Sequence, residues 1–162
     1  MDKTGLMLRG FYRVQIAEDD GEIVGDSGLL ENQITNLGVL QYLVNTLGAI
    51  AGSKQITHVV LGTGGAPASN DTALAGECVG TSSGGRQAVT AASSGSTAVQ
   101  FTGTFSSANS FVTQTQNISN IGLFNTSSFT TGTLFAGNTY ASSSCATNQN
   151  VNITYTITFS RP

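Results

Sequence analysis

Strict alternation of apolar and polar residues marks the C-terminal segment of the chain. Val151, Ile153, Tyr155, Ile157 and Phe159 alternate with asparagine and threonine. In an extended strand, every second side chain lies on the same face. The pattern therefore predicts a half-buried antiparallel strand whose apolar face, made of these five residues, lines the core.

Shorter segments of strand character recur along the rest of the chain. They are Leu8–Ala17, Ile23–Val24, Ile56–Leu61, Gln87–Ala92, Ala98–Phe105, Phe111–Ser119, Ile121–Phe124 and Thr133–Tyr140. The turn dipeptide Asp20-Gly21 predicts an exposed hairpin between the first two. Seven to nine short strands separated by turns indicate a mainly-β fold, an antiparallel β-sandwich of jelly-roll-like type.

One segment has helical spacing instead. Its apolar residues recur at steps of three and four and are Ile34, Leu37, Leu40, Leu43, Val44 and Leu47. This spacing predicts one short amphipathic helix near residues 33–47. Either Asn32 or Thr35 serves as the N-cap, and Gly48 and Gly52 are stop signals. We expect the apolar face to pack on a sheet or on its neighbours.

Length and composition favour one folded unit. A chain of 162 residues matches a single domain, residues 1–162, with residues 1–7 as an extended N-terminal arm. No apolar run is long enough for a membrane-spanning helix, and the N-terminus lacks the apolar region of a secretory signal. We therefore expect synthesis in a host cytoplasm, where Cys78 and Cys145 are free thiols.

Charge is scarce and unevenly placed. Charged residues make up 9% of the chain, against about 25% in ordinary globular proteins. All nine acidic residues lie at or before Glu77, and no charged residue stands between Arg86 and Arg161. Six scattered lysines and arginines exclude a basic face for nucleic acid. A surface of hydroxyls and amides packs against neighbours with little desolvation of charge, which favours a subunit of a repetitive assembly over a secreted or lectin-like sandwich.

The residues that could carry chemistry do not form a recognisable site. His58 is the single histidine and lies within a predicted strand, so we interpret it as a strand-face residue. With neither a second histidine nor a Cys-x-x-Cys motif, a transition-metal site is not indicated either. We predict no catalytic, cofactor-binding or metal-binding residues.

Two further patterns have structural interpretations. Asp19, Asp20, Glu22 and Asp26 cluster around a turn, but their spacing does not match a calcium-binding EF-hand, so a solvated hairpin tip is favoured. The run Gly62–Gly65 follows a strand, but it lacks the lysine and hydroxyl of a phosphate-binding loop. A turn is therefore the preferred interpretation.

A series of motifs carries a resemblance to a known group of proteins. They are GLLENQITNLG (28–38), THVVLGTGGAPASNDTALAGE (57–77) followed by Arg86, ISNIGLFN (118–125), TLFAGNTY (133–140) and VNITYTITFS (151–160). In this order they resemble small β-rich virion proteins of tailed bacteriophages, which occur as capsid decoration (cement) proteins or as tail and fibre components. The resemblance implies a sandwich that oligomerises, often as a trimer, on a shell or tail.

The hypothesis from the sequence is a non-enzymatic capsid decoration protein, located in the virion, that stabilises contacts between capsomers. Its expected partners are the major capsid protein or other virion proteins and further copies of the chain, with a trimer favoured and contacts within Gln87–Ser160. Neither nucleic acid nor membrane is an expected partner. The segment that grips a capsomer is either Met1–Leu8 or the loop Gly62–Gly85.

Two alternatives stay open. A tail, neck or fibre-base component has the same kind of composition. A carbohydrate-binding module is the weaker alternative, because tryptophan, the usual stacking residue for sugars, is absent and tyrosine would have to substitute.

Overall fold

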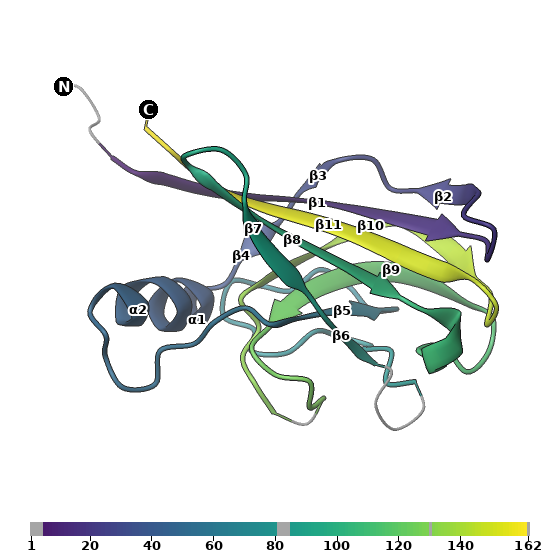
Figure 1. Cartoon of the computed structure of the whole chain (residues 1–162). Helices are drawn as coiled ribbons and strands as arrows, with labels where there is room; N and C mark the ends of the chain where they lie inside the picture. Colours follow the sequence, from purple (N-terminus) through teal and green to yellow (C-terminus); the bar gives the residue numbers. More distant parts are fainter. Residues whose placement is uncertain (1–4, 81–84, 130, 162) are drawn as a thin grey trace.

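The computed structural model describes residues 5–80, 85–129 and 131–161. These residues form two antiparallel sheets and one short helix, so the predicted mainly-β sandwich is confirmed (Figure 1). Within this part of the chain there are eleven strands instead of the expected seven to nine. The excess consists of very short strands and of one predicted strand that is divided in two.

The first sheet has six strands within the described residues and contains the first and the last strand of the chain. Its order is β2 (Ile23–Asp26), β1 (Met7–Ala17), β11 (Asn150–Ser160), β8 (Ala98–Phe105) and β7 (Thr90–Ser93), with β3 (Leu30–Glu31) also paired to β1. The long strands β1 and β11 pair over their whole length, from Met7↔Ser160 to Ala17↔Asn150. These two strands are the longest of the six-stranded sheet.

The second sheet has five strands among the residues described. Its order is β4 (Gln33–Ile34), β10 (Ala136–Cys145), β9 (Gln116–Phe124), β5 (His58–Gly62) and β6 (Arg86–Ala88). The two strands expected between Phe111 and Phe124 are in fact the single strand β9, preceded by a 3₁₀ turn at Ser107–Asn109. Phe111 and Val112 are buried without belonging to a strand.

The segment predicted as one strand over Gln87–Ala92 crosses between the two sheets. β6 belongs to the five-stranded sheet and β7 to the six-stranded sheet. Val89 lies between them, and its N–H donates to the carbonyl of Thr57 at 3.0 Å. The chain therefore passes directly from one layer of the sandwich to the other at Val89.

The core lies between the inner faces of the two sheets. Ile153, Tyr155 and Ile157 are buried and Phe159 packs at the edge of the core, as the alternation in β11 predicts. The Tyr12 ring stacks on Tyr155 with centroids 5.7 Å apart. Its hydroxyl donates to the carbonyl of Thr139 on the opposite sheet at 2.7 Å. Tyr12 thus connects both layers, and burial raises its pKa to about 12.

The helix begins at Asn36, three residues later than predicted. It consists of α1 (Asn36–Gly38), a π-helical stretch (Val39–Val44) and α2 (Asn45–Leu47). Gln33 and Ile34 form β4 instead, because they pair with β10. Thr35 is the N-cap, since its hydroxyl accepts from the N–H of Gly38 at 2.9 Å.

The sandwich has two dissimilar ends. The helix lies at the end where β1 begins and β11 ends, and the β1–β2 hairpin lies at the other end (Figure 1). Residues 1–4 of the expected N-terminal arm lie outside the described residues, and Met7 already belongs to β1. The described segments contain no helix long and apolar enough to cross a membrane.

Candidate interaction surface

The helix is held against the sandwich by its first turn. A Cβ atom on Gly38 would lie 2.2 Å from the carbonyl oxygen of Phe135, so only glycine permits this approach. The Thr35 hydroxyl donates to the Leu134 carbonyl at 2.7 Å. The Tyr42 hydroxyl donates to the Thr133 carbonyl. These contacts fix the orientation of the helix and therefore determine which of its faces points away from the core.

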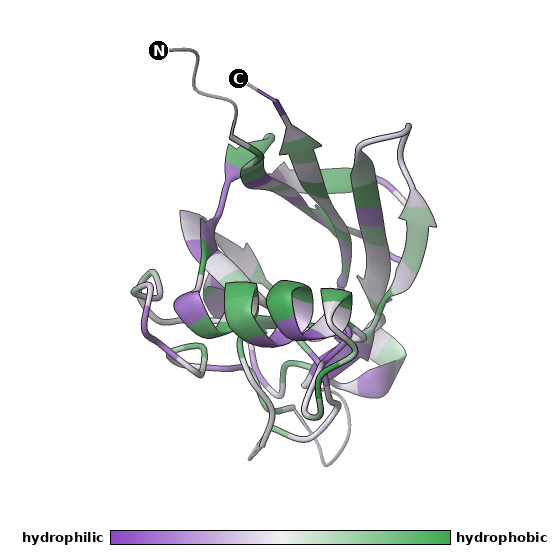
Figure 2. Ribbon diagram, turned by 90° about the vertical axis from the view of Figure 1, so that its left-hand side faces the viewer, coloured by the Kyte–Doolittle hydropathy of each residue, from purple (hydrophilic) through white to green (hydrophobic). Residues whose placement is uncertain are grey.

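The outward face of the helix is apolar. We define the helix face as five residues whose side chains are all substantially exposed: Val39, Leu40, Val44, Leu47 and Ile50. Leu47 is 90% exposed. Figure 2 views the molecule from this end and shows hydrophobic colouring along the helix. No charged residue occurs between Glu31 and Lys54, so the face carries no charge. Apolar surface that is gathered in this way typically marks a site of protein association.

A groove lies between the inner side of the helix and the six-stranded sheet. Its volume is 450 Å³. The lining side chains are mostly apolar. They come from the helix, the segment 54–56, strands of the six-stranded sheet and Phe135, which directly precedes β10; they include Leu43, Ile56, Val99 and Phe159.

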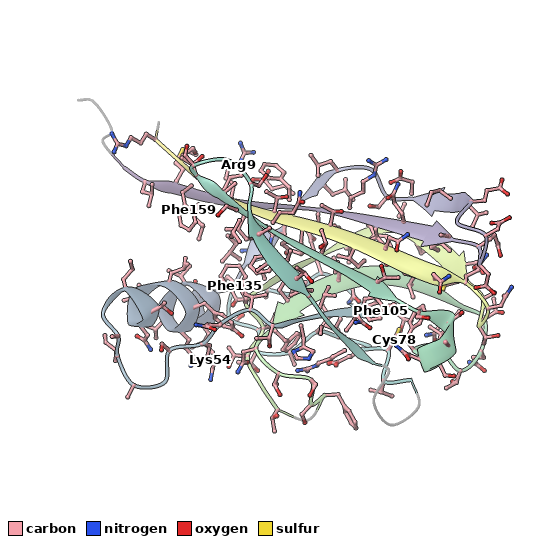
Figure 3. All side chains as sticks on the ribbon, in the orientation of Figure 1. Arg9, Lys54, Cys78, Phe105, Phe135 and Phe159 are labelled. Carbon is pink, nitrogen blue, oxygen red and sulfur yellow. The ribbon has the colours of Figure 1, made fainter. Side chains whose placement is uncertain are left out.

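Lys54 is the one charged residue in the lining of this groove. Figure 3 labels Phe135, Phe159 and Lys54 around it. Within the described part of the chain, the Lys54 ammonium group has neither an ion pair nor a hydrogen bond. The groove therefore combines an apolar interior with one unpaired cation.

The acidic residues considered for calcium form the hairpin tip. Asp19 and Asp20 are exposed, and the Asp20 carboxylate accepts from the N–H of Glu22 at 3.0 Å. Asp26 instead pairs with Arg13 on the outside of the sheet. Hydrogen bonding to Arg13, and also to the N–H of Gly28, holds the pKa of Asp26 well below its ordinary value. Across the described segments, no three acidic, cysteine or histidine side chains gather closely enough to hold a metal ion.

His58 lies in β5 and is only partly buried. Its Nδ1 atom is 2.8 Å from the Thr57 hydroxyl. Burial, with a smaller contribution from the positive charge of Arg86, lowers its pKa from the ordinary value of 6.5. Among the described residues, no carboxylate forms a hydrogen bond with its ring, so nothing orients the ring as a general base toward the Thr57 hydroxyl. This arrangement does not resemble a catalytic triad.

The glycine-rich run Gly62–Gly65 forms a turn that hydrogen bonds hold to neighbouring parts of the chain. The amide of Asn120, which is fully buried, donates to the carbonyls of Gly65 and Ala75 at 3.1 and 2.9 Å. The N–H of Thr63 donates to the carbonyl of Gly76. The loop is therefore tied to residues 75–76.

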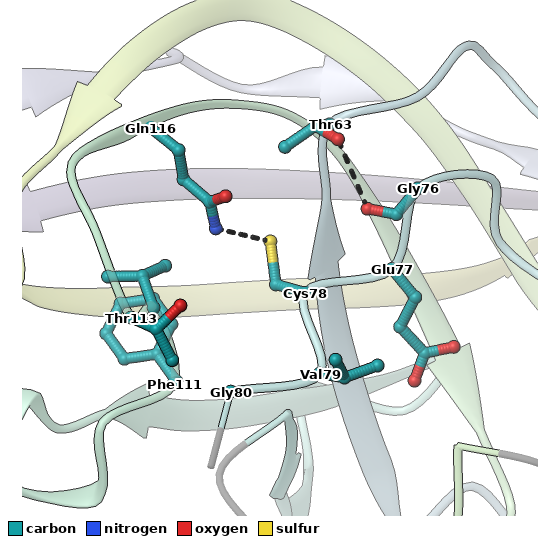
Figure 4. Close-up of a pocket in the computed structure, with 10 residues that line it drawn as sticks. Thr63, Gly76, Glu77, Cys78, Val79, Gly80, Phe111, Thr113 and Gln116 are labelled. Carbon is teal, nitrogen blue, oxygen red and sulfur yellow. Dashed lines mark hydrogen bonds between the residues drawn. The ribbon is translucent and has the colours of Figure 1, made fainter.

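A smaller pocket of 290 Å³ lies beside Cys78 (Figure 4). The Gln116 side-chain amide donates to the Cys78 sulfur at 3.2 Å. Burial raises the pKa of the Cys78 thiol to about 11, and burial raises that of Cys145 to about 11 as well. Both thiols are free and stay protonated at neutral pH, which makes them poor nucleophiles.

One buried ionic contact was not predicted. The Arg86 guanidinium binds the Glu77 carboxylate with two hydrogen bonds of 2.6 and 3.0 Å, and both side chains are almost inaccessible to solvent. It also lies 3.8 Å above the Phe124 ring and donates to the carbonyls of Thr126 and Thr131. The contact fastens the loops at 77 and 126–131. The sequence did not predict this ion pair, because two opposite charges nine positions apart match no local motif.

The aromatic residues offer little to a sugar ligand. All four tyrosines, Tyr12, Tyr42, Tyr140 and Tyr155, are buried in the core. Among the described residues, Phe129 is the large aromatic side chain that is exposed. A stacking platform built from tyrosines is therefore not present on the surface that the structure describes.

Comparison with family models, with curated proteins and with solved structures found no match to this chain.

Proposed function

We propose that the chain is a non-enzymatic structural subunit of a bacteriophage virion, and that it binds the outside of the capsid and stabilises contacts between capsomers. The observation that carries this proposal is the helix face, where apolar side chains without any charge are left uncovered by the chain itself. Burying such a face against neighbouring shell subunits would stabilise the shell by mass action.

The placement of the helix face supports a docked subunit. The helix face is at one end of the sandwich and the acidic hairpin is at the other (Figure 1). A subunit that docks through its helix would therefore hold its carboxylates away from the contact, where they stay hydrated. Docking in this orientation avoids the cost of burying charge.

The outer surface of the six-stranded sheet supports association between copies. Outward positions of β8 and β11 carry uncharged polar side chains, among them Thr102, Thr104, Asn152, Thr154 and Thr156. Such a surface packs against another copy without placing like charges together. We propose that the homo-oligomer, with a trimer favoured, uses this part of Gln87–Ser160.

A tail, neck or fibre-base component is the second candidate. The feature that favours it is the presence of two dissimilar ends, because subunits stacked along a tail contact one neighbour at each end.

The copy number in virions tests both proposals. Quantitative mass spectrometry of purified virions from the phage that encodes the chain should find it in hundreds of copies. A handful of copies would favour the tail position, and absence from the virion would refute both.

A binding assay tests the role of the helix face. Undecorated shells should bind the parent protein but lose binding to Leu47→Asp. The matched control is Leu29→Asp, which places the same charge at an exposed leucine outside the helix face. Equal binding by both variants would contradict docking through the helix.

A further inference from the structure

The β1–β2 hairpin, residues 18–24, combines exposed apolar side chains with carboxylates. Ile23 and Val24 are 44% and 50% exposed, although both are large aliphatic residues. Asp19, Asp20 and Glu22 stand directly before them and are exposed as well. Among the described residues, nothing hydrogen-bonds or ion-pairs with the Glu22 carboxylate. The hairpin therefore presents an apolar ridge with free negative charge beside it.

The shape of the hairpin results from a β-bulge. The pairing of β1 with β2 steps from Ile16↔Gly25 to Ala17↔Ile23, so Val24 is an extra residue on β2. A bulge of this kind bends the strand and re-aims its side chains. Because β2 is also the edge strand of its sheet, Ile23 and Val24 have no further strand of the described chain beside them.

The groove at the other end has complementary properties. Its lining is apolar apart from a few polar side chains, and Lys54 is its unpaired cation. The hairpin offers aliphatic side chains for the interior and a carboxylate for Lys54. Burial of aliphatic surface supplies the main stabilisation, and the charge pair supplies orientation and register.

Charge also decides between the possible contacts of two copies. A contact of groove with groove would bring two Lys54 side chains together. A contact of hairpin with hairpin would bring two acidic clusters together in a chain whose net charge is already −3. Only a contact of hairpin with groove pairs opposite charges.

We infer that the chain associates with itself head to tail, with the β1–β2 hairpin of one copy seated in the groove of the next. This contact is heterologous, so each copy has one occupied groove and one engaged hairpin. Successive contacts close into a ring or extend as a filament, depending on the rotation between neighbours. The inference deepens the proposed structural role, because it names the partner of one end of the molecule.

The test uses two variants of the full chain that each disable one half of the contact. Lys54→Glu reverses the charge in the groove and leaves the hairpin intact. Asp20→Lys combined with Glu22→Lys reverses the hairpin and leaves the groove intact. All three positions lie at partly or fully exposed sites, so both proteins are expected to fold, which circular dichroism and thermal melting will check.

Sedimentation velocity of the purified proteins gives the readout. The parent should form species larger than the 16.6 kDa chain in a concentration-dependent manner, and added salt should weaken them. Each variant alone should associate at least about tenfold more weakly than the parent, and any trimer that remains is attributed to the proposed contact through the outer face of the six-stranded sheet. An equimolar mixture should recover association to near the level of the parent, because both contacts between unlike copies again pair opposite charges. The unaltered hairpin of Lys54→Glu meets Lys54 of the other variant, and the reversed hairpin meets the reversed groove.

Asp71→Lys with Glu31→Lys is the control for the hairpin variant. It makes the same change in net charge at two acidic residues outside the hairpin, and its association should equal that of the parent.

Three results would overturn the inference. They are a monomeric parent at high micromolar concentration, a hairpin variant that associates as well as the parent, and a mixture that associates no better than either variant alone. If native mass spectrometry instead finds a small amphipathic anion retained by the parent and lost in Lys54→Glu, the groove belongs to that ligand and not to a second copy. Because this measurement uses pure protein, it can fail while the chain is still found in virions, so it is separable from the proposed function.

Discussion

Strand β11 and the helix both present regularly spaced apolar side chains, but the molecule covers them differently. In β11, Ile153, Tyr155 and Ile157 are buried between the sheets. In the helix, Tyr42 is buried, Leu43 is partly covered and Leu47 is almost entirely exposed. The difference teaches that periodicity determines which side chains share a face, whereas the rest of the chain determines whether that face is covered.

The largest effect is expected where the sandwich buries charge. Replacing Glu77 by alanine leaves the Arg86 guanidinium buried without its partner, which should cost about 3–5 kcal/mol in the free energy of unfolding. Glu31→Ala is the control, because Glu31 pairs with Arg9 in solvent and such pairs contribute about 0–1 kcal/mol. Chemical denaturation measures both, and equal losses would contradict the assignment of Arg86 and Glu77 to the interior.

The second-largest loss of stability is expected on the inner face of β11. Ile157→Ala removes buried methylene groups and leaves a cavity, which should cost about 2–5 kcal/mol. Thr156→Ala, on the outer face of the same strand, should cost much less. Thermal melts of the two proteins provide the measurement. If both lose the same stability, the two faces of the strand do not differ as described.

Two leucines of the helix extend the comparison over a single turn. Leu43 packs against the core and Leu47 does not. Leu43→Ala should therefore cost more than about 1 kcal/mol, whereas Leu47→Ala should change stability by no more than about 0.5 kcal/mol. The measurement is denaturant unfolding of the isolated protein. A large loss for Leu47→Ala would show that the helix face is covered within the chain.

The smallest effect concerns pH. Because the pKa of folded His58 is lowered, the unfolded chain binds the proton more tightly. The stabilisation from keeping His58 neutral is therefore present above pH 6.5 and is lost as the pH falls through the lower pKa of the folded state. In His58→Gln, the slope of stability against pH should be shallower in that window. An unchanged slope would place the histidine in solvent.

Local pattern was sufficient for the long strands. The alternation in β11 and the turn preference of Asp20-Gly21 depend only on neighbouring residues. The strand and the hairpin that they predict are both confirmed. The division of the segment 87–92 at Val89 depends on Thr57, more than thirty positions away. Glycine is unfavourable in a helix by propensity alone, but at Gly38 the close approach of the Phe135 backbone requires it.

Of the two candidate surfaces, the hairpin and the groove, only the hairpin could be predicted, because only its exposure depends on residues that are close in sequence. The acidic hairpin is exposed as expected, because a turn with four carboxylates has few other places to lie. The groove could not be predicted, since its wall is assembled from six separate segments of the chain. The ion pair of Arg86 with Glu77 likewise exists only once the two strands around it are in place.

The pairing of β1 with β11 also bears on how the molecule forms during synthesis. The partners of Met7–Ala17 are Asn150–Ser160, so a ribosome that adds roughly 5–20 residues per second needs on the order of ten seconds to supply them. During that interval β1 has an open hydrogen-bonding edge on the side later taken by β11, and nascent chains on one polysome hold such edges close together. Contacts this distant in sequence also make folding slow. A chaperone that shields Met7–Ala17 until β11 emerges would therefore raise the yield of folded protein.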